Sequence, residues 1–260
     1  MHRGSHRALR DGGEIGMSTG RKTTIGFDRT IHIEWLDIAV ARVSRGEPPS
    51  EIRKVLWDFL EDLVPGNTNN SGRGKTLTVL TRIWLTVPEQ VEPLRDRALK
   101  CLAAANGENR VAVHWAMVVA THPFFFDVAT HVGKLLALQG QANRSQIKRR
   151  MTESWGDRST LERTIQHVLK SMAQWGVLRP GSEKGSLVVA RNPIQVSEEI
   201  AELLVHGVML SQGRGMSLSQ LVSHPALFPF KLQVNAARLR KHEGLQVQRQ
   251  GDQSDFVELR

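Results

Sequence analysis

The feature that most constrains the fold is an apolar stripe of helical spacing that ends directly before two strand-like segments. Its members recur every three or four residues, as on one face of a helix: Leu161, Ile165, Val168, Leu169 and Met172. Ser159 and Glu162 have the spacing of a capping box at the start of this helix, and Gly176 is placed to end it. Because a helix with one apolar face needs a partner, its neighbours determine the fold.

Those neighbours predict a winged helix-turn-helix at 141–191. Asn143 or Ser145 is suited to cap the preceding short helix, and residues 180–185 have the composition of a tight turn between two strands. The expected order is a first helix, a short helix, the helix with the apolar stripe and a two-stranded hairpin: about 124–139, 146–155, 159–175, 177–179 and 186–191.

The flanking parts of the chain are also mainly helical. Residues 24–140 predict a bundle of five or six helices separated by Pro, Gly and polar loops. Residues 192–260 repeat the helix-and-hairpin plan loosely and predict a second, degenerate winged-helix-like domain that stabilises or binds protein. Residues 1–23 are expected to be a disordered basic leader, and Met17 is a second plausible start, which leaves residues 1–16 in question.

Positive charge is concentrated in the predicted winged helix. The whole chain has 35 Lys and Arg against 26 Asp and Glu, a net charge of +9. The leader contributes +3, and residues 141–191 contribute +6 from ten basic and four acidic residues. Residues 24–140 and 192–260 are each neutral, with thirteen and seven groups of either sign. A local excess of this kind is typical of a surface that binds a polyanion, nucleic acid above all.

The helix with the apolar stripe supplies candidates for base contacts. When its apolar side faces the core, the residues that point outward are Thr160, Arg163, Gln166, His167 and Lys170. Arg and Gln can form paired hydrogen bonds with guanine and adenine, and Lys170 lies further along the helix, where a phosphate is the better partner.

The remaining basic residues of the segment are candidate phosphate contacts. Lys148, Arg149 and Arg150 are consecutive on the short helix, so one or two of them can face the same way. The complete set predicted to bind nucleic acid adds the residues around the helices and the hairpin: Arg144, Arg158, Arg179, Lys184 and Arg191. A solvated basic face and a protein-binding winged helix remain alternatives.

The sequence gives little support for metal binding, nucleotide binding or nucleophilic catalysis. The single cysteine, Cys101, lies on an apolar helix face and excludes a multi-cysteine metal site. Residues 69–76 end like a phosphate-binding loop, but Asn69 stands where the first glycine belongs, which leaves Arg73 and Lys75 as candidate phosphate contacts. The sequence shows no nucleophile motif or clustered metal ligands, and we expect a protein that is not an enzyme and has no cofactor.

The chain resembles a known family. The helix pair with Trp115 and the run Phe124-Phe125-Phe126-Asp127, followed by a helix ending in Trp175-Gly176-Val177-Leu178, resembles BrxA, the small accessory protein of BREX bacteriophage-defence systems. The apolar loop 224–230 and the closing hairpin around Arg249 agree with the resemblance, which covers about residues 25–260. It implies a NusB-like helical half, duplex DNA as a partner, other defence-system proteins as further partners, and no catalysis.

Three functions therefore remain open. They are a DNA-binding accessory protein of phage defence, a transcriptional regulator with a winged helix, and a scaffold in a multisubunit complex. RNA is an alternative to DNA in the first of these. No apolar signal segment or membrane span is evident in the sequence, and no small-molecule substrate is indicated. We therefore expect a cytoplasmic location.

Overall fold

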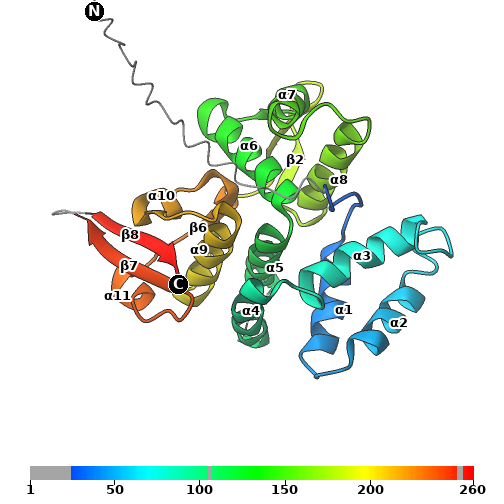
Figure 1. The fold of residues 1–260 in the computed structure, drawn as a ribbon. Helices are drawn as coiled ribbons and strands as arrows, with labels where there is room; N and C mark the ends of the chain where they lie inside the picture. Colours follow the sequence, from blue (N-terminus) through cyan, green and yellow to red (C-terminus); the bar gives the residue numbers. More distant parts are fainter. Residues whose placement is uncertain (1–24, 105–106, 251–253) are drawn as a thin grey trace, which may run out of the picture.

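The computed structural model describes residues 25–104, 107–250 and 254–260, and it is mainly helical (Figure 1). The predicted leader and the questioned residues 1–16 lie outside these ranges. Figure 1 shows α5 (Gly107–Thr121) at the centre, with the N-terminal helices on one side and α9 (Glu198–Gln212) on the other.

The N-terminal helices are α1 (Ile33–Val43), α2 (Pro49–Phe59) and α3 (Gly72–Trp84). Helices α1 and α3 pack on α5, and α2 packs on α1 and α3. The short 3₁₀ turn η1 (Glu89–Val91) and α4 (Glu92–Ala104) follow, and α4 packs on both α5 and α9. The sequence favours Ser50 as the cap of the second helix and Leu77 as the start of the third, and both starts differ in the structure. Helix α2 begins after Pro48 without a side-chain cap, and α3 begins at Gly72, where the Ser71 hydroxyl accepts a hydrogen bond from the Gly74 amide.

Helix α6 (Pro123–Gln139) follows α5 after a sharp bend. The segments 109–121 and 123–139 would together have the length and composition of a membrane span, but they meet at 118°, and no single helix within the described ranges meets that test alone. The aromatic run Phe124, Phe125 and Phe126 is buried in the core.

The part of the chain after α6 contains a three-stranded antiparallel sheet and two helices. In chain order these elements are β1 (Ala142–Asn143), α7 (Arg144–Trp155), α8 (Leu161–Gln174), β2 (Leu178–Pro180) and β3 (Ser186–Val189). The strand order is β1-β3-β2, so the first strand pairs with the last. Asn143 caps α7, and Gly176 adopts a positive φ of 70° directly after α8, as its position in the sequence predicts.

The predicted capping box of α8 is absent. The helix begins at Leu161 after Thr160, which makes no side-chain cap. Glu162 instead accepts a hydrogen bond from Lys148 Nζ at 2.6 Å, so it joins α7 to α8. An ion pair across the turn has replaced a local contact that sequence spacing favoured.

The C-terminal part repeats the same strand order in a second sheet. It contains α9, β5 (Met216–Ser217), α10 (Leu218–Val222), η2 (Pro225–Leu227), α11 (Ala236–Leu239), β7 (Leu245–Gln250) and β8 (Ser254–Leu259). The order is β5-β8-β7, again first, last and middle. Helix α11 is only four residues long, although the sequence favours a helix over residues 234–242.

Aromatic packing around Trp115 joins these parts into one core. The Trp115 ring lies edge to face with those of Phe125, Trp175, Phe228 and Phe230, and its indole nitrogen donates to the Ala226 carbonyl at 3.0 Å. A short parallel pairing between β4 (Ile194–Gln195) and β6 (Phe230–Lys231) fixes the same region. The apolar loop 224–230 therefore packs inside the molecule.

Candidate nucleic-acid interface

Helix α8 presents an exposed polar stripe opposite its buried face. Leu161, Ile165, Val168, Leu169 and Met172 are buried. Arg163, Gln166 and Lys170 are exposed, and their spacing of three and four residues places them on one side of the helix. The structure therefore keeps together three of the residues predicted to contact nucleic acid. Thr160 is also exposed, at the end of the turn that leads into the helix.

His167 differs from the other predicted α8 contacts. Its Nδ1 lies 3.0 Å from Thr30 Oγ1, and its ring is half-buried against the segment that precedes α1. Burial lowers the pKa of His167, and the nearby Arg29 lowers it further. Next to it, the Ile31 amide donates to Ser171 Oγ at 2.8 Å. The segment before α1 thus covers one flank of α8, and His167 is a packing residue there.

The three consecutive basic residues of α7 have different environments. Lys148 is paired with Glu162 on α8, and that hydrogen bond raises its pKa. Arg150 lies 3.1 Å from Glu153 one turn along the same helix. Arg149 is exposed and forms no ion pair with any described residue. Arg149 is therefore the residue of the three whose charge is most available to a phosphate.

The hairpin brings two predicted cations beside the start of α7. The Arg144 amide donates to the Gly185 carbonyl at 3.1 Å, so the helix begins against the β2–β3 turn. Arg144 and Lys184 line the same surface hollow of about 430 Å³. Both side chains are exposed, as is that of Arg179 on β2.

The last two predicted contacts, Arg191 and Arg158, lie on either side of α8 in the sequence. Arg191 Nε donates to the Gly176 carbonyl at 2.9 Å, which ties the segment after β3 to the end of α8. Arg158 is exposed in the turn between α7 and α8. We assign Arg191 a structural contact that sequence spacing did not reveal, because its partner lies fifteen residues earlier.

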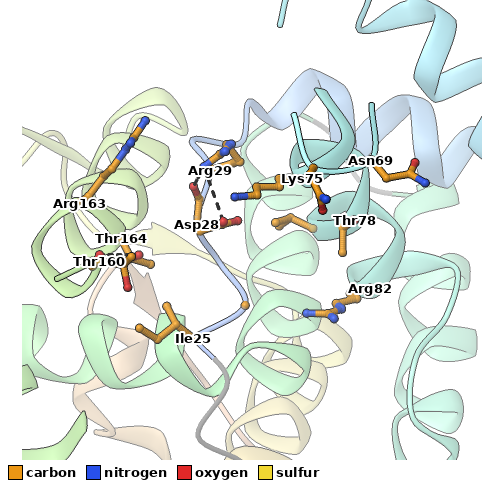
Figure 2. Close-up of a pocket in the computed structure, with 13 residues that line it drawn as sticks. Ile25, Asp28, Arg29, Asn69, Lys75, Thr78, Arg82, Thr160, Arg163 and Thr164 are labelled. Carbon is orange, nitrogen blue, oxygen red and sulfur yellow. Dashed lines mark hydrogen bonds and ion pairs between the residues drawn. The ribbon is translucent and has the colours of Figure 1, made fainter. Parts of the chain in front are cut away.

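A second basic region, which sequence analysis largely missed, lies between α3 and α8. A pocket of about 430 Å³ is lined by Arg29, Lys75, Arg82 and Arg163, together with Asp28 and several Asn and Thr residues (Figure 2). The candidate phosphate contact Lys75 belongs to this pocket. The signal in the sequence is the Gly-Lys-Thr at 74–76, which without the first glycine does not predict a nucleotide site.

Arg73, the second candidate phosphate contact of residues 69–76, is not available to a ligand. Its side chain is buried, pairs with Glu61 at 3.3 Å and lies 4.7 Å above the Trp57 ring. Arg73 therefore connects the start of α3 to Trp57 on α2 and to Glu61 just after the end of α2. The expectation that Arg73 contacts a phosphate is therefore wrong, because the guanidinium is already enclosed.

The remaining candidates for chemistry are packed groups. His114 Nε2 lies 3.0 Å from Asp37 Oδ1, and burial lowers the pKa of this histidine. Cys101 is half-buried, which raises the pKa of its thiol and disfavours the thiolate. Within the described ranges, no three His, Cys, Asp or Glu residues come close enough to hold a metal ion.

Comparison with protein-family models, with curated proteins and with solved structures gave no match to this chain.

Proposed function

We propose that this chain is a non-enzymatic protein that binds duplex DNA through a winged helix-turn-helix formed by α6, α7, α8 and the β2–β3 hairpin. The observation that carries the proposal is the exposed stripe of Arg163, Gln166 and Lys170 on α8. The order α6-β1-α7-α8-β2-β3 and the strand order β1-β3-β2 support the assignment, since a winged helix has this sequence of elements.

The chemistry and position of the stripe suit the major groove. Arg163 and Gln166 lie one turn apart near the start of α8, where a recognition helix meets base edges. Arg pairs with guanine and Gln with adenine through two hydrogen bonds each. Lys170 on α8, Arg149 on α7 and Lys184 in the β2–β3 turn are also exposed and are suited to phosphates.

The biological setting follows from the resemblance to BrxA. We propose an accessory role in a BREX-like phage-defence system, with the 192–260 part serving contacts to other proteins of that system. That part repeats the strand order of the first sheet but has no net charge, and α11, in the place of the recognition helix, has only four residues. These features favour protein binding or stabilisation over DNA binding by the second unit.

The test is a salt-dependent titration with a random duplex DNA. Arg149→Ala combined with Lys184→Ala should lower the slope of log K against log salt by about 2, because each removed cation gives up about one phosphate contact. Lys148→Ala should change the slope by less, since Glu162 already partners that lysine. Lys100→Ala combined with Lys241→Ala removes two exposed charges elsewhere, is the matched control and should leave the slope unchanged.

The outcomes separate the functions left open by the sequence. Stronger binding to duplex DNA than to single-stranded DNA or duplex RNA supports the proposal. Absence of binding to any of the three at tens of micromolar protein would overturn it and favour the scaffold. Binding by the Arg149 and Lys184 variant with the parent's affinity and slope would also overturn the assignment of this face.

A further inference from the structure

The pocket between α3 and α8 is built by three segments that are far apart in the sequence. Residues of the 25–29 segment line it, together with the loop before α3, one side of α3 from its first to its last turn, and the start of α8. Figure 2 shows Lys75 and Arg82 of α3 across from Thr160 and Thr164 of α8. Its volume of about 430 Å³ is within the usual range for ligand sites, roughly 300–1,000 Å³.

Positive charge exceeds negative charge in this pocket. Arg29, Lys75, Arg82 and Arg163 line it, and Asp28 is the acidic residue among the lining groups. Asp28 Oδ2 lies 3.6 Å from Arg29 Nη1, so the charges of these two residues offset each other. Lys75, Arg82 and Arg163 form no ion pair with any residue that the structure describes. Three like charges around one cavity repel each other unless an anion lies between them.

Neighbouring histidines are also affected by this charge. Burial lowers the pKa of His122 to about 3, and Arg82 contributes in the same direction. On the other wall, Arg29 and Arg163 add to the effect of burial on His167. Neutral hydrogen-bond donors are present as well: Asn69 and Asn70 line the rim beside Lys75, and Thr160 lines the opposite wall.

We propose that this pocket binds a phosphate group, held by Lys75, Arg82 and Arg163. Lysine and arginine at a polar cavity are the side chains that bind phosphate as a point charge and through paired hydrogen bonds. The phosphate comes either from the backbone of a nucleic acid or from a soluble phosphorylated compound such as a nucleotide. The first source rests on the proposed function, because Arg163 belongs both to the pocket and to the exposed stripe of α8.

The test removes the two pocket cations that lie outside the α8 stripe. The variant is Lys75→Gln with Arg82→Gln, and the control is Lys100→Gln with Lys241→Gln, which removes the same charge from exposed positions elsewhere. Two probes are used with the full chain: inorganic pyrophosphate by calorimetry at low salt, and a duplex DNA by anisotropy between about 50 and 200 mM salt. Arg82→Gln alone, at an exposed position, serves if the double variant does not fold.

Either of two results supports the proposal and identifies the source. Pyrophosphate binding by parent and control that weakens tenfold or more in the pocket variant indicates a soluble compound. Loss of DNA affinity in the pocket variant alone, with the salt slope smaller by about 2, indicates strand phosphates. If the parent binds no DNA, the proposed function fails and the pyrophosphate arm alone decides this site. The proposal is overturned if the pocket variant and the control behave alike in every arm where the parent binds, or if the parent binds neither probe.

Discussion

His206 and His242 meet in the core although 36 positions separate them in the sequence. Their ring centroids lie 4.8 Å apart, edge to face, and both rings are buried. Burial lowers the pKa of His206 to about 4 and that of His242 to about 3, with Arg97 adding to both shifts. Sequence spacing did not suggest this pair, because α9 and the turn before β7 meet only in the folded chain.

Because of this pair, the stability of the protein should depend on pH. The folded pKa of His206 is below the unfolded value of 6.5, so between pH 6.5 and about 4 the unfolded chain binds the proton and the folded chain does not. Stability should therefore fall as pH decreases through that window. From pH 7.5 to 5 the parent should lose on the order of 2 kcal/mol more than His206→Gln. Urea unfolding at both pH values measures this, and parallel losses in parent and variant would contradict it.

At the scale of elements, close packing fixes α6 against the apolar loop after α10. Gly133 on α6 lies directly against the backbone of η2, and a Cβ at that position would overlap the Pro225 carbonyl oxygen. The same loop receives the hydrogen bond from Trp115 and stacks His224 on Phe126 at 5.3 Å. The backbone conformation of Gly133 does not itself require glycine, since its φ is not positive. Glycine is needed because the backbones of α6 and η2 approach each other too closely for a Cβ.

Gly133→Ala should therefore destabilise the fold. The added methyl group meets backbone that cannot rotate away, so we expect a loss of about 1–3 kcal/mol. Gly107→Ala at the start of α5 is the control, since a Cβ there would have no atom of the described residues within 4 Å. Thermal unfolding of both variants tests the prediction. Equal midpoints for parent and Gly133→Ala would show that η2 can move away from α6.

At the scale of the whole molecule, one apolar core runs through all parts of the described chain. The same cluster of buried residues includes Phe27, Trp115, Trp175 and Val257. Trp175 donates from its indole nitrogen to the Ile31 carbonyl at 2.9 Å, which connects the end of α8 to the segment before α1. Parts that share a core in this way are expected to unfold together.

We therefore expect a single unfolding transition for the full chain. All six tryptophans lie between residues 35 and 175, so their fluorescence reports α1 to α8, whereas far-ultraviolet circular dichroism also reports α9. The two signals should change at the same urea concentration. A dichroism transition that fluorescence does not share would mean that the 192–260 part unfolds independently.

Sequence periodicity and capping were sufficient to predict the mainly helical fold and most of its elements. Sequence spacing predicts the buried stripe of α8 and the end of that helix at Gly176. Ser197 and Ser217, which have the residue type and position of helix caps in the sequence, cap α9 and α10. These features depend on hydrogen bonds and side-chain spacing within a few residues, so the local sequence contains the information that determines them. The exposed stripe of Arg163, Gln166 and Lys170 follows from the same periodicity.

Tertiary structure alone decided which polar groups are available. Arg73 is enclosed by Glu61 and Trp57, His167 faces Thr30 from 137 positions away, and Lys148 is paired with Glu162 in place of the expected capping box. The pocket of Lys75, Arg82 and Arg163 exists because residues 25–29 lie between α3 and α8. Periodicity gives the side of a helix that is buried, but the identity of the covering segment depends on packing between distant parts of the chain.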